Sequence, residues 1–196
     1  MTAAVITYDA PMVRWDPDSR GRLAQAAMEL YLEHGYDRTT VAEIAQRAGL
    51  TERTFFRHFA DKREVLFDGS HALQSFLVDG VTAAPPGSPV DALARALEGA
   101  GARFQEVPER VRARQVVIDA NPELQERELI KLATLAGALA EALRARDVPE
   151  PAASLAAEAG IAVFKVAFAR WVHTEGADLP GAIRDSFDVL RAVTAA

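Results

Sequence analysis

Apolar residues recur along this chain with the three- and four-residue spacing of helices, and no run of alternating β-branched residues indicates a strand. The first pattern begins after Asp18 and Ser19 and ends at Gly35. Its apolar face consists of Leu23, Ala26, Ala27, Leu30 and Tyr31. The pattern therefore predicts a helix that buries one face.

Two shorter helices are predicted next, each of which opens on a threonine. Thr39 or Thr40 can cap the first of them, and Glu43, three residues after Thr40, completes a capping box. Thr51 can cap the second, over residues 52–59.

Capping and proline signals divide the remainder into six further helices. Asp61 is expected to cap a fourth helix that runs towards Val81, and a loop over residues 83–89 follows it. The later helices are expected to begin at Ser88-Pro89, Pro108, Asn121-Pro122, Pro151 and Leu179-Pro180. The prediction is an all-α fold of about nine helices, with an N-terminal three-helix domain and a C-terminal helical domain.

Composition agrees with packed helices and excludes several kinds of chemistry. Hydrophobic residues make up 49% of the chain and aromatic residues only 7%. The chain contains no cysteine, which excludes disulfides, zinc-thiolate sites and thiol catalysis. The first 17 residues lack the pattern of a signal peptide, and Lys165 and Arg170 interrupt the most apolar stretch. A cytoplasmic protein without a membrane span is expected.

Charge is distributed unevenly. The net charge is -6, yet residues 38–63 carry six basic residues against three acidic ones. Residues 70–196 carry 13 basic and 17 acidic residues. A basic edge on an acidic body can approach nucleic acid while the body is repelled, which orients the encounter.

Residues 35–59 combine two short helices with a glycine-containing turn, the arrangement of a helix-turn-helix. Gly49 suits the left-handed backbone conformation of a tight reversal. A small core is expected from Ile44, Ala45, Leu50, Phe55 and Phe59. The positions expected to face outward are Thr51, Glu52, Arg53, Thr54, Arg57 and His58.

This segment resembles the DNA-binding domain of the TetR family of transcriptional regulators. The resemblance lies in the run Thr-Thr-Val-x-x-Ile-Ala-x-x-Ala-Gly over residues 39–49, Thr-Phe-Phe-Arg-His-Phe over residues 54–59, and Asp-Lys-x-x-Val-Leu over residues 61–66. It implies a flexible arm over residues 1–17, a DNA-binding domain over residues 18–67, and a ligand-binding and dimerisation domain over residues 68–196.

The family pattern assigns DNA contacts that the chemistry supports. Arg53 and Thr54, near the start of the recognition helix, are the expected readers of base edges in the major groove. Arg57 is expected to read a base or bind phosphate. Thr40 can present its hydroxyl group and backbone N–H to phosphate, as helix N-termini do.

The remaining expected DNA contacts include two departures from the family pattern. His58 and Lys62 are expected to contact phosphate, while Thr51 serves mainly as a cap. Phe56 replaces the usual tyrosine, so it can touch a thymine methyl group or a sugar but cannot donate a phenolic hydrogen bond. Glu52 either accepts a hydrogen bond from cytosine N4 or holds Arg53 in place.

The resemblance also implies a pocket and a dimer. The expected interface stripes are Ala156, Ala159, Gly160, Val163, Ala167, Arg170 and Trp171, and on the last helix Ile183, Phe187, Leu190 and Val193. The side chains large enough to line an apolar pocket are Phe76, Phe104, Val116, Ile118, Phe164, Phe168 and Trp171. The possible polar anchors are Arg103, Arg112, Gln115 and Asn121.

Together these features predict a homodimeric repressor that leaves its double-stranded DNA operator when a small hydrophobic or amphipathic molecule binds. The ligand is expected to shift the fourth helix and so change the spacing of the two recognition helices. The alternative is a helical ligand-binding or interaction module that does not use its helix-turn-helix. Phe56 and the acidic net charge support that alternative.

An enzyme is not indicated. The histidines are dispersed, and no carboxylate cluster or His-x-x-x-His pair marks a metal site. The sequence Gly99-Ala-Gly101 lacks the preceding strand that a nucleotide-binding fold requires. No metal and no cofactor are therefore expected.

Overall fold

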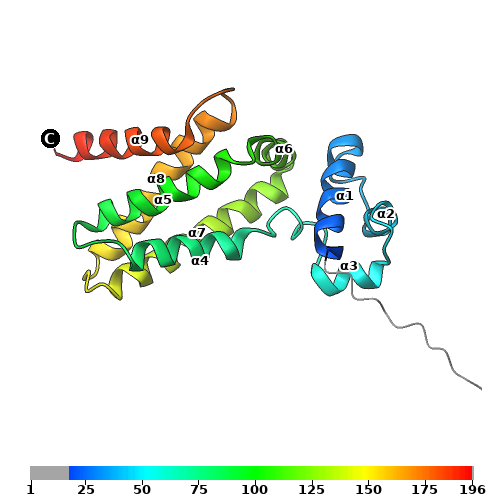
Figure 1. Cartoon of the computed structure of the whole chain (residues 1–196), viewed down its shortest axis with the longest axis horizontal. Helices are drawn as coiled ribbons and strands as arrows, with labels where there is room; N and C mark the ends of the chain where they lie inside the picture. Colours follow the sequence, from blue (N-terminus) through cyan, green and yellow to red (C-terminus); the bar gives the residue numbers. More distant parts are fainter. Residues whose placement is uncertain (1–17, 196) are drawn as a thin grey trace, which may run out of the picture.

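The computed structural model describes residues 18–195, which form nine helices and no strand. The predicted all-α, nine-helix fold is confirmed, while the arm predicted over residues 1–17 lies outside the described residues. The helices are α1 Ser19–His34, α2 Val41–Arg47, α3 Glu52–His58, α4 Ser70–Thr82, α5 Pro89–Gln105, α6 Pro108–Asp119, α7 Pro122–Arg144, α8 Ala152–Val172 and α9 Leu179–Thr194. Figure 1 shows α1–α3 at one end of an elongated molecule and the C-terminal end of α9 at the other.

The first three helices follow the local signals in the sequence. Thr40 and Glu43 form the reciprocal capping box at the start of α2, and the Thr51 hydroxyl accepts a hydrogen bond from the Thr54 backbone N–H at the start of α3. Gly49 has φ +66°, a left-handed conformation that side-chain-bearing residues rarely adopt. These features set the tight turn that brings α3 against α1 and α2.

The expected start of the fourth helix at Asp61 is wrong, because α4 begins at Ser70. Asp61 instead accepts hydrogen bonds from the backbone N–H groups of Arg63 and Glu64, at 2.8 and 3.1 Å. Residues 61–69 are turns, and backbone bonds such as the one from the Phe67 N–H to the Glu64 carbonyl span only three residues. We call residues 61–69 the linker turn. It separates α3 from α4.

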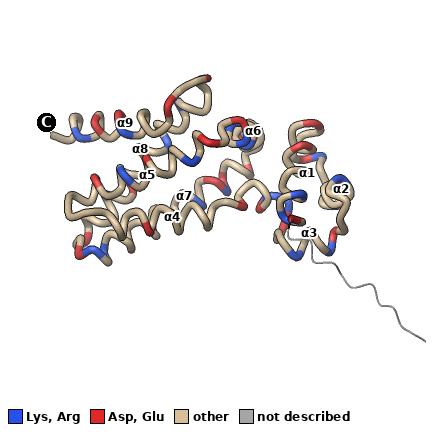
Figure 2. Tube along the Cα trace, in the orientation of Figure 1, with Lys and Arg blue, Asp and Glu red and all other residues tan. Residues whose placement is uncertain are grey.

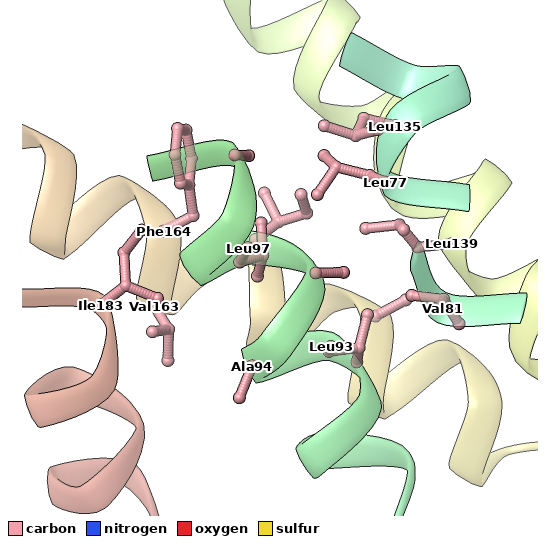
Figure 3. Packing of buried hydrophobic residues seen from close by; sticks show 14 of the residues in the cluster. Leu77, Val81, Leu93, Ala94, Leu97, Leu135, Leu139, Val163, Phe164 and Ile183 are labelled. Carbon is pink, nitrogen blue, oxygen red and sulfur yellow. The ribbon is translucent and has the colours of Figure 1, made fainter. Parts of the chain in front are cut away.

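A large apolar core fills the space between α4, α5, α7, α8 and α9. Helix α5 packs against α4, α8 and α9, and α7 packs against α4 and α8. Figure 3 shows Leu77 of α4, Leu97 of α5 and Leu139 of α7 directed towards one another. A Cβ atom at Gly101 would lie 2.9 Å from Ile183 Cδ1, so this glycine serves the close approach of α5 and α9.

A second core holds α1–α3 together, and the C-terminal part contributes to it. Leu23, Ile44 and Phe55 are fully buried in this cluster. Ile118 of α6 and Leu124 of α7, also fully buried, belong to the same cluster. Because α6 packs against α1, the helix-turn-helix end shares apolar surface with the rest of the molecule (Figure 1).

Helix α8 is long and apolar enough, by length and composition, to cross a membrane. Its buried residues nevertheless belong to the large core, where α8 packs against α5, α7 and α9. Such packing is that of a core helix in a helical protein.

Candidate DNA interface and adjoining cavity

Helix α3 presents a polar and basic surface over a buried apolar one. Phe55 is fully buried and Phe59 nearly so, with their ring centroids 5.5 Å apart. Arg53 and Arg57 are exposed on the other side, and the exposed fraction of Phe56 is 55%. In Figure 2 the basic positions of α2 and α3 lie at the end of the molecule opposite the C-terminus. This surface can therefore reach a DNA groove without obstruction by the remaining helices.

The two threonine caps leave the starts of α2 and α3 exposed. Thr40 Oγ1 accepts from the Glu43 backbone N–H at 3.2 Å and donates to the Glu43 carboxylate at 2.8 Å. Backbone and hydroxyl hydrogen bonds from Thr40 hold the pKa of Glu43 below its ordinary value. Thr51 and Thr54 pair through their hydroxyl groups, 3.1 Å apart. Both helices thus begin with ordered N–H groups and short hydroxyl side chains at the surface.

The sequence predicts that Lys62 contacts DNA phosphate, but in the structure its side chain is bound to backbone carbonyl groups of the same chain. Its ammonium nitrogen donates to the carbonyl groups of Tyr36, Asp37 and Thr39, at 2.8, 3.2 and 2.9 Å. It also lies 4.3 Å from the centroid of the Tyr36 ring. Since an ammonium group has three donors, these bonds use all of them. The structure gives Lys62 the role of fixing the linker turn to the residues before α2.

His58 is half-buried at the end of α3 and is held by α1. Its Nε2 atom lies 2.8 Å from the hydroxyl oxygen of Ser19, which is itself buried. Burial lowers the pKa of His58, and the charges of Arg57 and Arg20 lower it further, against a smaller opposing effect of Asp68. The structure therefore favours a neutral His58 that joins α3 to α1.

The lowered pKa of His58 predicts a pH-dependent stability. Because the unfolded chain binds this proton more readily, the stabilisation is present above the ordinary pKa of 6.5 and is lost as pH falls through the folded-state value. The His58→Gln variant does not titrate at this position. Between about pH 7.5 and about pH 5.5, urea midpoints should fall more for the wild type than for this variant. Parallel pH dependences would contradict the prediction.

Arg47 of α2 is tied to α1. Its guanidinium group donates two hydrogen bonds to the Glu33 carboxylate, at 3.0 and 2.8 Å. The pair lies on the exposed surface, so it joins α1 to α2 without contributing much to stability.

A cavity of about 1180 Å³ lies between the C-terminal helices and the helix-turn-helix end. Its apolar wall includes Leu73, Phe104, Val111, Leu132, Leu135, Phe164 and Phe168. Ala24 and Met28 of α1, together with residues 65–71, form the side of the cavity nearest to the N-terminal helices. The cavity is large enough for a drug-sized organic molecule.

Charged and amide side chains line the end of the cavity next to the linker turn. Arg114 Nε donates to the Leu66 carbonyl at 2.7 Å, and its guanidinium carbon lies 5.0 Å from the Phe67 ring centroid. Arg114 also pairs with Glu128 of α7 at 3.0 Å. Arg127 of α7 pairs with Glu64 at 2.6 Å. Side chains of α6 and α7 therefore hold the linker turn directly.

Two protein-family models together match most of the chain. Residues 23–68 match the family described as bacterial regulatory proteins, tetR family, and residues 87–195 match the MftR C-terminal domain. The chain belongs to the TetR family. The fold and the helix-turn-helix described above are those of a TetR-family transcriptional regulator, so the family assignment made from the sequence is confirmed.

Individual relatives agree with this assignment. MftR of Mycobacterium tuberculosis is 27% identical over 176 residues, which cover 87% of this chain and 88% of MftR. The transcriptional regulator TcmR of Streptomyces glaucescens is 35% identical over 89 residues, 45% of this chain and 39% of TcmR. The repressor SmeT of Stenotrophomonas maltophilia has a TM-score of 0.61 at 24% identity, with 89% of each chain covered. These relatives are regulators rather than enzymes.

The cavity contains three of the seven side chains predicted to line a TetR-type pocket, namely Phe104, Phe164 and Phe168. The other four predictions are corrected. Ile118 is fully buried in the core around α1–α3, and the exposed fraction of Val116 is 61%. Phe76 lies under the Arg103 guanidinium group, and Trp171 is buried beside Phe168 with its Nε1 donating to Gln105.

Among the four possible polar anchors, only Gln115 lines the cavity. Arg103 stacks on Phe76, with its guanidinium carbon 3.7 Å from the ring centroid. Arg112 donates to the Thr174 carbonyl, and Asn121 donates to the Val117 carbonyl. Sequence reasoning missed the contributions of α1 and the linker turn to the cavity wall, because the sequence places residues 65–67 in a regular helix.

The apolar stripes predicted for dimerisation mostly face the interior of the chain itself. Val163, Ala167 and Trp171 of α8, like Ile183 and Phe187 of α9, are buried in the large core. The large apolar residues of these helices that are exposed are Leu155 and Val166 of α8 and Val189 and Val193 of α9. Of the predicted stripe residues, Arg170 and Val193 are exposed, so the dimer interface on α8 and α9 stays a prediction.

Proposed function

We propose that this TetR-family regulator is a homodimeric repressor that a small hydrophobic or amphipathic molecule releases from a DNA operator. Residues 18–67 would bind DNA, and residues 68–196 would bind the molecule and the second protomer. The observation that carries the proposal is the cavity of about 1180 Å³, whose wall includes the linker turn behind the recognition helix. A cytoplasmic location follows from a DNA target.

The DNA contacts are proposed for the exposed residues of α3 and the two threonine caps. Arg53 and Thr54 would read base edges, and Arg57 would read a base or bind phosphate. Thr40 and Thr51 would place helix N-termini against phosphates. Glu52 would accept from cytosine N4, and Phe56 would contact a thymine methyl group or a sugar.

Ligand-induced release from DNA is proposed to act through the linker turn, which forms part of the cavity wall. Arg114 lines the cavity and binds the Leu66 carbonyl, while Arg127 lines it and binds Glu64. A molecule that displaces these side chains would move the linker turn and, with it, the orientation of α3. Two-fold recognition needs half-site centres about 34–36 Å apart or a multiple, so a reoriented α3 in each protomer would lower DNA affinity.

Dimerisation is proposed through the exposed faces of α8 and α9. Leu155 and Val166 lie eleven residues apart on α8, about three helical turns, so they share a face. Val189 and Val193 lie four residues apart on α9, which packs against α8. Burying these four exposed side chains against a second copy would remove their apolar surface from water.

A cavity-filling substitution tests the release mechanism. A panel of apolar and amphipathic organic compounds would be screened for a raised melting temperature, and the active compounds would be titrated against the DNA complex. We expect active compounds to weaken DNA binding about 5- to 150-fold. Val111→Trp, on the cavity wall, should abolish both responses. Val116→Trp, on the exposed face of the same helix, should retain them.

The outcomes of this experiment test the ligand site and the release mechanism separately. If Val111→Trp responded like Val116→Trp, the ligand site would not be this cavity. If compounds raised the melting temperature without weakening DNA binding, release would be contradicted and DNA binding would stand. Repression is tested by transcription in vitro from a promoter that overlaps the bound fragment, which the protein should lower and an active compound should restore.

A further inference from the structure

The cavity is lined by more basic than acidic side chains, although the chain as a whole is acidic. Its basic residues are Arg110, Arg114, Arg127, Lys131 and Lys165, and its acidic residues are Asp68, Asp119 and Glu128. With histidines counted as neutral, five positive charges against three negative ones give the wall a formal charge of +2, whereas the chain carries -6. A cleft with apolar walls and an excess of one sign of charge attracts a ligand of the opposite sign.

Ion pairs within the chain do not cancel this excess. The pairs that involve wall residues are Arg114 with Glu128 at 3.0 Å, Arg127 and Lys131 with Glu64 at 2.6 and 3.4 Å, and Asp68 with Arg20. Two of these partners, Glu64 and Arg20, lie outside the wall and bring one charge of each sign. The excess of two positive charges therefore remains when the partners are included.

Arg110 of α6 and Lys165 of α8 are the basic wall residues outside these pairs. Both are exposed, and neither makes an ion pair or a side-chain hydrogen bond within the part of the chain that the structure describes. Each lies beside the apolar part of the wall, because Arg110 precedes Val111 and Lys165 follows Phe164. Helix α6 packs against α8, so the two cations belong to adjoining walls. An acidic group at this edge of the cavity can pair with them and keep its contact with water.

We propose that the effector is an amphiphile with an acidic head group, which Arg110 and Lys165 bind while its apolar chain lies against Phe104, Phe164 and Phe168. The three rings contact one another at centroid distances of 5.5–6.2 Å and so form one apolar surface. This inference rests on the proposed function, because it assigns the charge of the molecule that fills the same cavity. The positive wall repels a cationic amphiphile of the same length, and a neutral one binds through its apolar chain alone.

Decanoate, decylammonium and decanol, which have equal numbers of carbon atoms, test the inference. At about pH 7.5 the first two are charged, and decanol reports the fit of the apolar chain alone. By calorimetric titration of the full chain below micelle-forming concentrations, we expect decanoate to bind about 10-fold or more tightly than decylammonium. The double variant Arg110→Gln and Lys165→Gln should bring this ratio close to one and leave decanol affinity unchanged. Arg95→Gln, an exposed position outside the cavity, should keep the wild-type ratio.

Salt and stability separate charge recognition from a structural role. Added salt should shrink the wild-type ratio, because it screens exposed charges. Since both side chains are exposed and unpaired, the ligand-free melting temperature of the double variant should equal that of the wild type. Equal binding of decanoate and decylammonium by the wild type, binding of none of the three, the wild-type ratio in the double variant, or its earlier melting with loss of decanol binding would overturn the inference. The proposed function is judged separately, by the responses of the Val111→Trp and Val116→Trp variants to the compound panel.

Discussion

Phe55→Ala is expected to lower the free energy of unfolding by about 3–5 kcal/mol, the usual cost of removing a fully buried phenylalanine side chain. Phe55 is fully buried in the core that joins α1, α2 and α3, and it contacts the rings of Phe56 and Phe59 at centroid distances of 5.5 Å. Removal leaves a cavity under the recognition helix. Urea unfolding followed by circular dichroism measures the loss, and DNA affinity should fall with it.

Phe56→Ala is the matched control for this prediction. The two residues are adjacent on α3, but the exposed fraction of Phe56 is 55%. Its loss should cost no more than the edge-to-face ring contact, about 0.5–1.5 kcal/mol, while DNA affinity falls if Phe56 contacts a thymine methyl group or a sugar. Equal destabilisation by the two variants would contradict the burial that separates them.

Replacing Arg53 and Arg57 together with alanine is expected to remove most of the preference for a specific DNA sequence. Both side chains are exposed on α3, and neither has an acidic partner among the described ion pairs. A bidentate arginine contact with guanine discriminates by about 1–3 kcal/mol, so the double variant should lose about 10-fold or more in preference. Fluorescence anisotropy with the selected sequence and a scrambled duplex measures this ratio.

Arg95→Ala serves as the control for charge. Arg95 is an exposed arginine on α5, within the C-terminal helices, so its loss changes the net charge without touching α3. It should leave the ratio of specific to scrambled affinity unchanged. Measurement at several salt concentrations separates the two effects, because phosphate contacts change the salt dependence whereas base contacts change the ratio. A helical module that does not use its helix-turn-helix would show no difference between the double variant and the control.

Local signals in the sequence predict the starts of most helices, namely those at which a cap or a proline decides the boundary. Thr40 with Glu43, Thr51 and Ser88 all cap the helices predicted for them. The left-handed Gly49 sits at the predicted reversal. These features depend on a few neighbouring residues, so they are readable without knowledge of the fold.

The linker turn could not be predicted in this way. Asp61 is a plausible cap by residue type, and the apolar residues after it suggest a helix. Val65, Leu66 and Phe67 are all buried, however, and three consecutive residues cannot lie on one face of an α-helix. The chain buries them between α1 and α6 by forming turns.

The sequence also could not predict which apolar side chains line the cavity and which pack inside the chain, because tertiary packing decides this. Phe104, Phe164 and Phe168 line the cavity because α5 and α8 happen to meet there, whereas Trp171, one turn beyond Phe168, turns towards Gln105. On α9, Ile183 and Phe187 have the spacing of an interface stripe but are buried against the chain's own core. Hydrophobic spacing identifies a buried face; it does not say which partner covers it.

The central claim is that α3 reads a specific DNA sequence in a two-fold symmetric complex. Selection of duplex fragments from a genomic library by the purified full chain, followed by sequencing, tests this most directly. The proposed homodimer predicts enrichment of an inverted repeat with half-site centres about 34–36 Å apart or a multiple, and loss of that repeat when Arg53 and Arg57 are alanine. Failure of the wild type to enrich any sequence at low salt, or enrichment of the same repeat by the double variant, would contradict it.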